Sequence, residues 1–502
     1  MNNKIDIMNN KIDIMNNKID IKNNKIDIKN NKIDIKNNKI DIKSIVRIIS
    51  EGYEFDWKSP FNKSSDNNSI GTGFFIDSEY ILTCCHVVEN SLKIYINIPS
   101  LDKEKYEVEL ISCSPCLDIA LLKTNVYKSK YFLELDDSDK SKATDKIIAV
   151  GYPLGLENAK YSAGIISGIE EHFFQIDAPI NEGNSGGPLL NSNNKVIGIN
   201  TSKITTSEGI GFSTPINFFK NQKELMLKNK IIRKCNLLCE FNDMDINLWK
   251  YLTEDKIDKS YTSGYYIKKC YQDSNLFSKY GIDTGDILLE INDNKVDNYG
   301  EINVPWNSEK INLDNYLKRF NKDDVIKIKI WSSKQKKIIE INYKLNYNFP
   351  INFGLPILEK IDYIVFGGLV LMNFSLNHIK IYKDDYLDLF IANKIKFKKN
   401  PKVIISNILS GSTIKKNEVI NEGNILFSIN NIEIYCLDDV IRVIRDTVNK
   451  DSKYIILKNQ NNDTVCLNIF TGIKETYSLA KVYNYDWKND IIINLYKIFR
   501  NK

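Results

Sequence analysis

The strongest constraint on this 502-residue chain is a run of glycines around one serine, Gly183-Asn184-Ser185-Gly186-Gly187. Glycine has no Cβ, so a serine between glycines can occupy a turn that other neighbours would block. On such a turn the backbone N–H groups of Gly183 and Ser185 point the same way as the Ser185 hydroxyl, and they stabilise negative charge that develops in a transition state. The run predicts a serine nucleophile with an oxyanion hole. Taken alone, it also fits a tight loop without chemistry.

A base and an orienting acid for this serine lie upstream. His86 follows the apolar run Tyr80-Ile81-Leu82-Thr83-Cys84-Cys85 and is one of three histidines in the chain. Asp118 comes 32 residues later, and Ser185 a further 67 residues on. An imidazole accepts the proton of a serine hydroxyl near neutral pH, and a carboxylate holds the imidazole in the required orientation. The order His86, Asp118, Ser185 therefore predicts a catalytic triad.

These segments resemble the Deg/HtrA family of trypsin-like serine proteases over roughly residues 44–219. The matching segments are Gly71-Thr72-Gly73-Phe74-Phe75-Ile76, Leu82-Thr83 through His86-Val87-Val88, Asp118-Ile119-Ala120-Leu121-Leu122, Gly151-Tyr152-Pro153-Leu154-Gly155, Gln175-Ile176-Asp177-Ala178, Gly183 through Asn191, and Gly211-Phe212-Ser213 with Pro215. The resemblance implies His86 as base, Asp118 as orienting acid and Ser185 as nucleophile. Cys84 and Cys85 depart from the Asn-Ala or Ala-Ala that is usual in relatives, and we interpret both as small buried hydrophobic residues.

The resemblance also implies a substrate pocket. In this fold the residue six before the serine lies at the base of the pocket for the side chain that precedes the scissile bond. Pro179 holds that position and Ile180 follows it. No acid is present there to pair with lysine or arginine, so we expect an apolar pocket for small or medium aliphatic side chains. Specificity should be loose, because one methylene discriminates by only about 1–3 kcal/mol.

Short β-branched and aromatic runs separated by polar turns predict an all-β architecture for this region. They lie at residues 69–88, 93–98, 107–111, 146–150, 164–169 and 195–200. The resemblance implies two β-barrels with the triad in the cleft between them. The expected fold class is mainly β: a trypsin-like double β-barrel protease domain followed by two PDZ-like α+β domains.

Two later stretches resemble PDZ domains, which bind an extended peptide by adding it to a sheet edge. The first combines Tyr261-Thr262-Ser263-Gly264-Tyr265-Tyr266-Ile267 with a strand-like run at 285–292. It implies Gly264, Tyr265, Tyr266 and Ile267 as peptide-binding residues, with C-terminal peptides as candidate partners. The second stretch has strand-like runs at 401–406 and 421–430 and a helical pattern at 437–448. It has Asn424 in place of an acid and no clear carboxylate-binding loop, which favours packing against a neighbouring subunit. The join at 363–370 resembles the plant-type branch of the family.

The predicted organisation has five parts: a repeat at 1–43, the protease domain at 44–228, PDZ-like domains at 234–346 and 347–475, and a C-terminal tail at 476–502. The repeat contains six seven-residue units from Met1 to Ile42. Its isoleucines alternate two and five residues apart, whereas a coiled coil needs spacings of three and four. We therefore expect a low-complexity, disordered segment, with strand-type self-association as the alternative.

Aromatic residues cluster just after the start of the protease domain, at Tyr53, Phe55, Trp57 and Phe61. Members of the family use aromatic N-terminal segments to build trimers, so the resemblance implies a homo-oligomer, a trimer or a multiple of one. The alternative is that these rings cover the base of the first barrel.

Global properties exclude several classes of protein. The net charge of +5, from 69 basic and 64 acidic residues, is too small and too dispersed for a nucleic-acid-binding protein. No apolar stretch reaches the roughly 20 residues needed to span a bilayer. The first residues lack the apolar core of a signal peptide, which predicts an intracellular protein. The nine cysteines include Cys113-Ser114-Pro115-Cys116 without a second such pair, so we expect reduced thiols and no metal.

Two functions are compatible with these features. The leading one is an ATP-independent serine endopeptidase that forms an acyl-enzyme intermediate and cleaves unfolded or damaged proteins, because no phosphate-binding glycine loop and no cofactor motif is present. The alternative is a non-proteolytic chaperone or PDZ-based scaffold whose protease domain is held at rest.

Overall fold

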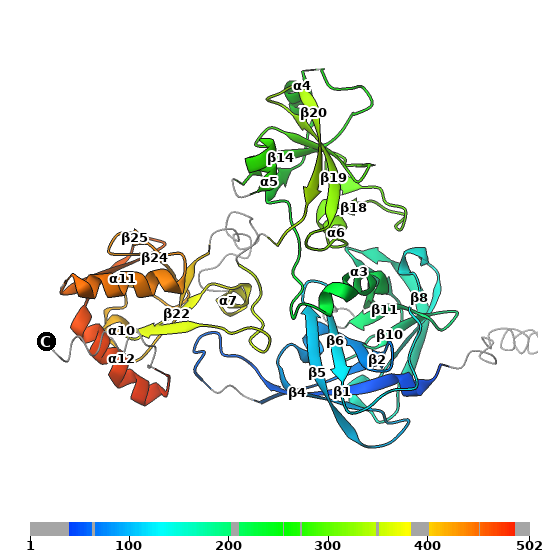
Figure 1. The fold of residues 1–502 in the computed structure, drawn as a ribbon, viewed down its shortest axis with the longest axis horizontal. Helices are drawn as coiled ribbons and strands as arrows, with labels where there is room; N and C mark the ends of the chain where they lie inside the picture. Colours follow the sequence, from blue (N-terminus) through cyan, green and yellow to red (C-terminus); the bar gives the residue numbers. More distant parts are fainter. Residues whose placement is uncertain are drawn as a thin grey trace, which may run out of the picture.

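The computed structural model describes residues 40–62, 66–201, 210–254, 256–271, 274–347, 351–382, 401–450 and 452–486. In these residues the chain forms two closed six-stranded barrels, then a six-stranded sheet and a seven-stranded sheet. Figure 1 shows the barrels together at the lower right, the six-stranded sheet above them and the seven-stranded sheet at the left. The expected mainly-β fold class with a trypsin-like double barrel is confirmed. The repeat expected at 1–43 lies almost wholly outside the described residues.

The first barrel closes in the order β1-β2-β3-β6-β5-β4. Its strands are β1 (Ile45–Tyr53), β2 (Asp66–Phe75), β3 (Tyr80–Thr83), β4 (Ser91–Asn97), β5 (Lys105–Ser114) and β6 (Ile119–Thr124), with the short helix α2 (Cys85–Val88) directly after β3. The apolar runs fill its core, where Ile45, Phe74 and Leu82 are fully buried. Helix α2 is held at the mouth of this barrel because it begins where the buried strand β3 ends.

The second barrel closes in the order β10-β11-β12-β9-β8-β7. Its strands are β7 (Lys146–Gly151), β8 (Lys160–Glu170), β9 (Phe173–Ile176), β10 (Pro188–Asn191), β11 (Val196–Thr201) and β12 (Gly211–Pro215). The 3-10 turn η3 (Pro153–Gly155) lies between β7 and β8, and helix α3 (Ile216–Met226) follows β12. Residues Gly183 to Gly187, called the serine turn below, lead directly into β10, so the turn is anchored to a barrel strand on its C-terminal side.

The six-stranded sheet contains the order β13-β14-β15-β19-β20, with β16 (Asn294–Lys295) paired to β15. Its other strands are β13 (Cys239–Asn242), β14 (Tyr265–Cys270), β15 (Ile287–Ile291), β19 (Val325–Ser332) and β20 (Lys337–Lys344). The helices of this unit are α4 (Ile246–Thr253), α5 (Asn275–Tyr280) and α6 (Leu313–Leu317), and β17 (Glu301–Ile302) pairs β18 (Ile311–Asn312) just before α6.

The seven-stranded sheet contains the order β21-β22-β23-β24-β26-β27, with β25 (Ile432–Glu433) paired to β24. Its strands are β21 (Tyr363–Phe366), β22 (Leu369–Asn373), β23 (Val403–Ile408), β24 (Ile425–Ile429), β26 (Tyr454–Asn459) and β27 (Thr464–Asn468), and its helices are α7 (Leu376–Ile381), α10 (Thr413–Asn417), α11 (Leu437–Asn449) and α12 (Ile469–Tyr483). Helix α11 confirms the helical pattern predicted at 437–448. Helix α12 runs through the boundary expected at 475/476 because its apolar residues Ile473, Leu479 and Ala480 are buried on both sides of that point. The segment from 476 therefore begins inside a packed helix and not in a tail.

The aromatic residues after β1 pack neither on the base of the first barrel nor on an outer surface. Phe55 and Trp57 join the apolar cluster of the seven-stranded sheet, and Phe61 lies 5.8 Å from Tyr363 between ring centroids. The Ser406 hydroxyl donates to the Lys58 carbonyl at 3.0 Å. Figure 1 shows this blue segment reaching across to the yellow strand β22. The β1–β2 connection is therefore a strap within one chain, because its rings are occupied in burying the seven-stranded sheet.

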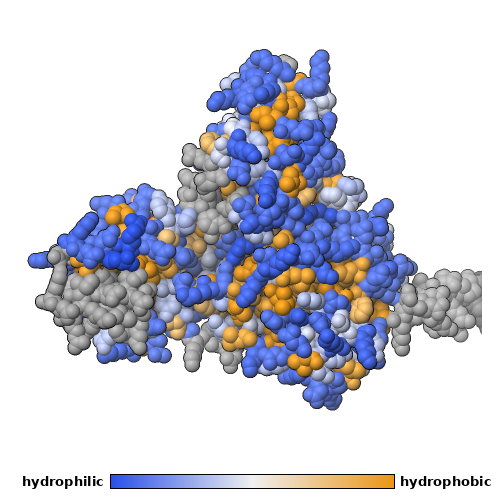
Figure 2. Space-filling model, viewed as in Figure 1, coloured by the Kyte–Doolittle hydropathy of each residue, from blue (hydrophilic) through white to orange (hydrophobic). Residues whose placement is uncertain are grey.

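On the face that Figure 2 shows, most residues are hydrophilic, and hydrophobic residues gather over the two barrels and in a smaller group on the unit of the six-stranded sheet. In the described part of the chain, no helix combines the length and the apolar character that crossing a membrane would need.

Candidate active site

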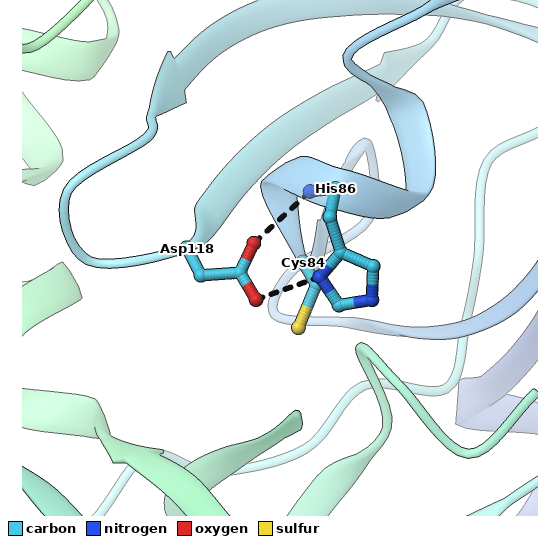
Figure 3. A group of neighbouring side chains, drawn as sticks. All are labelled: Cys84, His86 and Asp118. Atoms are coloured by element: carbon cyan, nitrogen blue, oxygen red, sulfur yellow. Dashed lines mark hydrogen bonds and ion pairs between the residues drawn. The ribbon is translucent and has the colours of Figure 1, made fainter. Parts of the chain in front are cut away.

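His86 and Asp118 meet at the mouth of the first barrel through two hydrogen bonds (Figure 3). The His86 backbone N–H donates to Asp118 Oδ1 at 3.0 Å, and His86 Nδ1 lies 2.7 Å from Asp118 Oδ2. The Asp118 side chain is 6% exposed and the His86 side chain 22%. An ionised carboxylate can only accept, so Nδ1 carries the proton, and Nε2 is left as the basic nitrogen.

The Asp118 carboxylate accepts a further hydrogen bond that the sequence did not indicate. The hydroxyl of Thr201, at the end of β11 in the second barrel, donates to Asp118 Oδ2 at 2.9 Å. Asp118 itself adopts the left-handed backbone conformation, with φ of 55°, in the turn before β6. Aspartate tolerates this conformation better than most residues. The carboxylate is thus fixed from both barrels.

Cys84 lies beside the His86–Asp118 pair, and its thiol donates to the Asn200 carbonyl at 3.1 Å. Burial, followed by the charge of Asp118, raises the pKa of the Cys84 thiol well above its ordinary value. Ligand atoms of Cys84, His86 and Asp118 lie within 4.8 Å of one another, which is the spacing of a metal-binding group. Two ligands on tetrahedral zinc would stand roughly 3.3 Å apart, given metal–ligand distances of about 2.0–2.1 Å. The 2.7 Å between His86 Nδ1 and Asp118 Oδ2 is instead the length of a charge-assisted hydrogen bond.

The serine turn lies against the segment that carries His86. Gly186 has φ of +86°, its N–H donates to the Asn200 carbonyl at 2.8 Å, and a Cβ on it would stand 2.2 Å from Thr83 Oγ1 and 3.0 Å from the Cys84 nitrogen. Only glycine allows this approach. Asn200 therefore accepts hydrogen bonds from both sides, one from the serine turn and one from the residue two before His86.

The carbonyls of Glu182, Gly183 and Ser185 are each held by a donor outside the serine turn. Leu154 N–H donates to the Glu182 carbonyl at 2.8 Å, and Thr72 donates to the Gly183 and Ser185 carbonyls at 2.6 and 2.8 Å. A trans peptide points its N–H and C=O to opposite sides. The Gly183 N–H therefore points away from Leu154, and within the described residues it has no hydrogen-bond acceptor.

The expected pocket residues differ in burial. Pro179 is exposed, whereas Ile180 is buried and contacts Gly211, at which a Cβ would stand 2.8 Å from Ile180 Cγ1. Ile180 is thus available as an apolar lining residue beside β12. The residues of the C-x-x-C pair also differ, since Cys113 is buried and Cys116 is exposed.

The expected peptide-binding residues lie in the interior of the six-stranded sheet. Tyr265, Tyr266 and Ile267 belong to β14, which pairs with β13 on one side and with β15 on the other. Adding a peptide strand needs unpaired backbone groups at an edge. The placement of edge addition at Gly264 to Ile267 is therefore wrong, and the edge strand on this side of the sheet is β13. The sequence missed β13 because its four residues carry no glycine-rich signal.

Comparison with known proteins agrees with the two barrels. Residues 71–199 match the family model described as "Trypsin-like peptidase domain". A probable serine protease do-like from Buchnera aphidicola is 28% identical over 373 residues, covering 70% of this chain and 72% of that protein. A probable periplasmic serine endoprotease DegP-like from Rickettsia conorii is 35% identical over 253 residues, covering 47% and 48%. The periplasmic serine endoprotease DegP of Escherichia coli is 29% identical over 248 residues, covering 47% and 50%. For the latter two relatives, the match spans only about half their length.

Among solved structures, the HtrA-type protease AlgW with a decapeptide is 21% identical with a TM-score of 0.46, covering 61% of this chain and 95% of that one. The fold and the matched segment define a trypsin-like peptidase domain. The homologues of the chain are serine endoproteases of the Deg/HtrA type. The likeness to the plant-type branch and the intracellular location stay predictions.

Proposed function

We propose that the protein is a serine endopeptidase in which Ser185 attacks a peptide carbonyl while His86 Nε2 takes its proton. Asp118 holds the imidazole and stabilises the imidazolium, and the N–H groups of Gly183 and Ser185 bind the oxyanion. His86 gives this proton to the leaving amine as the C–N bond breaks, which leaves an acyl-enzyme on Ser185. His86 then takes a proton from water, which attacks the acyl-enzyme, and returns that proton to the Ser185 oxygen as the acid product leaves. Peptide bonds after small or medium aliphatic residues are favoured by the Pro179 and Ile180 region.

One observation carries this proposal above the others. The 2.7 Å contact between His86 Nδ1 and Asp118 Oδ2 orients a histidine whose preceding segment is packed against Gly186, the neighbour of Ser185. Acyl transfer needs both an oriented base and a nucleophile close to it, and this contact provides the first beside the proposed second.

The architecture that accompanies the barrels supports proteins as the substrates. In the described part of the chain β13 is an edge strand of its sheet, which suits an extended peptide, and an unfolded chain supplies such segments. We assign the enzyme to the removal of unfolded or damaged proteins, with C-terminal peptides at β13, and we expect a homo-oligomer. None of these assignments needs a nucleotide or a metal.

The experiment compares casein hydrolysis by the full chain and by Ser185→Ala, with labelling by a fluorophosphonate, which reacts with activated serines. We expect turnover and labelling of the wild type and neither in the variant. Equal hydrolysis by both proteins would refute Ser185 as the nucleophile. A wild type that binds unfolded casein but neither cleaves it nor takes up the label would support the chaperone or scaffold.

A further inference from the structure

We infer that Thr72 is a positioning residue for the oxyanion hole. Its hydroxyl ties the Gly183 carbonyl to the Tyr152 N–H. It so holds the serine turn against the segment whose Leu154 N–H binds the Glu182 carbonyl, and the Glu182–Gly183 peptide carries the Gly183 N–H. The inference rests on the proposed function. Thr72 lies in β2 between Gly71 and Gly73, is fully buried, and touches none of the reacting atoms proposed above.

The Thr72 hydroxyl makes one bond as a donor and one as an acceptor. It donates to the Gly183 carbonyl at 2.6 Å and accepts from the Tyr152 N–H at 2.9 Å. A hydroxyl has a single proton to donate, and here that proton is used on Gly183. The side chain therefore ties the serine turn to the end of β7.

The Thr72 backbone joins the same turn from a second direction. Its N–H donates to the Ser185 carbonyl at 2.8 Å, and its carbonyl accepts from the Thr83 hydroxyl at 2.8 Å. Gly183 and Ser185 are the two residues whose N–H groups form the proposed oxyanion hole. Thr72 thus fixes the carbonyl of each of these residues, one through its side chain and one through its backbone.

Loss of the hydroxyl has a specific consequence at Gly183. The carbonyl would lose its donor in a buried place, which is costly unless the carbonyl turns elsewhere. Gly183 has φ of +90°, and glycine rotates to other conformations with little steric resistance. Rotation at Gly183, with loss of the tie to Tyr152, loosens the serine turn from the segment whose Leu154 N–H holds the Glu182 carbonyl. The Gly183 N–H, which shares a peptide with that carbonyl, is then no longer held toward the substrate. Loss of one oxyanion donor costs up to about 10²–10³ in kcat.

Two substitutions separate the hydroxyl from the shape of the side chain. The Thr72 methyl packs against the turn, since a Cβ on Gly187 would stand 3.1 Å from Thr72 Cγ2. Thr72→Val keeps a methyl in this place and removes the hydroxyl, and Thr72→Ser does the reverse. A role in packing alone would make Thr72→Ser the more harmful change.

The experiment measures kcat and KM on an unfolded-casein peptide, together with the affinity for a peptide aldehyde, which forms a tetrahedral adduct with the serine. For Thr72→Val we expect kcat to fall about 10- to 100-fold and aldehyde affinity to fall by a similar factor. KM should change less than about twofold, and Thr72→Ser should stay within about threefold of wild type.

Binding of the uncleaved peptide is measured in the Ser185→Ala background, where it should be equal with and without Thr72→Val. If the wild type is active and Thr72→Val has the same kcat and aldehyde affinity as the wild type, the inference about Thr72 is overturned and the proposed function stands. Losses in Thr72→Ser as large as in Thr72→Val would also overturn it. A wild type with no turnover and no fluorophosphonate labelling would overturn the proposed function and this inference together.

Discussion

Asp118 receives hydrogen bonds from the backbone of His86, the ring of His86 and the hydroxyl of Thr201. Two of these donors come from the first barrel and one from the second. A carboxylate bound by several donors is held in one orientation, which in turn fixes the imidazole. The relative position of the two barrels is therefore coupled to the orientation of the proposed base.

Thr201→Val removes the donor from the second barrel and keeps the volume of the side chain. Because two donors remain on Asp118, we expect a moderate effect, a fall in kcat of about 10-fold, which corresponds to about 1.4 kcal/mol. Steady-state hydrolysis of a casein peptide measures it. Thr201→Ser keeps the hydroxyl and is the matched control, expected within about twofold of wild type. Wild-type kcat in Thr201→Val would show that this bond does not contribute to orientation.

At the scale of single residues, the sequence identified functional residues that stand out by their type or their neighbours. It did not identify those that look like any other buried residue. His86 stands out among three histidines, and Ser185 among glycines, so order and spacing were enough to pair His86 with Asp118. Thr72 and Thr201 are ordinary buried threonines, and each reaches its partner 111 or 83 residues away. Such contacts depend on the packing of two barrels, which no local pattern expresses.

Strand β13 carries a cysteine that lies next to a second cysteine in the neighbouring strand β14. Cys239 in β13 faces Cys270 in β14, and their sulfur atoms lie 3.3 Å apart. The Tyr271 N–H donates to the Leu238 carbonyl, so the cysteine pair is a non-hydrogen-bonded pair, in which side chains approach most closely. This geometry is within reach of a disulfide.

We predict that oxidised glutathione converts Cys239 and Cys270 to a disulfide. The Cys270 thiolate attacks the glutathione disulfide and releases one glutathione thiolate, and Cys239 then attacks the mixed disulfide, losing its proton and releasing the second. The thiol of Cys239 donates to Cys270 and lowers the pKa of Cys270, which favours it as the attacking group. Peptide mapping by mass spectrometry without reductant should find the crosslinked pair. Cys239→Ser is the control, and recovery of both residues as free thiols in oxidised wild type would contradict the prediction.

The turn between β8 and β9 carries a second titratable contact, His172. Burial, and then the charges of Lys318 and Lys234, lower the pKa of His172 to about 3. Its Nδ1 lies 2.9 Å from Lys318 Nζ, and the Glu171 carboxylate lies 3.8 Å from it. The Lys318 ammonium can donate only to the neutral ring, so the folded state holds His172 unprotonated.

The stability of the barrels should therefore fall with acid. Above about pH 6.5, the ordinary pKa of histidine, neither state binds this proton. Between about pH 6.5 and 3 the unfolded state binds it and the folded state does not, so the free energy of unfolding falls as the pH falls. Urea unfolding at several pH values measures the slope. His172→Gln should reduce the slope of the unfolding free energy against pH by the equivalent of up to one proton bound on unfolding. An unchanged slope would mean that other groups cause the acid sensitivity.

Strand positions were predictable because β-branched runs report local burial, but strand order was not. The peptide-binding assignment failed at β14 for this reason. Its residues resemble a binding loop, yet whether a strand lies at an edge depends on its pairing with other segments, and Cys270 of β14 pairs with Cys239, 31 residues earlier. The strap of Phe55 and Trp57 was missed similarly. An exposed-looking aromatic run does not say which surface it covers.

Specific side-chain contacts join the units of the molecule. The strap from β1–β2 joins the first barrel to the seven-stranded sheet. The six-stranded sheet contacts the second barrel through the segment after α6, where Arg319 makes two hydrogen bonds to Asp139, at 2.8 and 2.7 Å. The Arg319 guanidinium also stacks on Trp306, 4.1 Å from the ring centroid. This side chain is 14% exposed, so the contact is largely shielded from water.

Arg319→Ala should weaken the docking of the six-stranded sheet on the barrels without unfolding either. The substitution removes both hydrogen bonds and the cation–π contact and leaves Asp139 without its arginine, a loss of about 2–4 kcal/mol in docking free energy. Solution X-ray scattering should report a larger radius of gyration, and hydrogen exchange should rise at His172 and α6 while the strands of both units stay protected. Arg319→Lys keeps the charge but cannot bind Asp139 through two nitrogens, so we expect an intermediate result.

The control is Arg442→Ala, which breaks an exposed pair with Asp439 inside α11 and should leave both measurements unchanged. A radius and an exchange pattern in Arg319→Ala equal to those of wild type would mean that the remaining contacts, Lys318 with His172 and Asn321 with the Asn221 carbonyl, hold this sheet in place without the arginine.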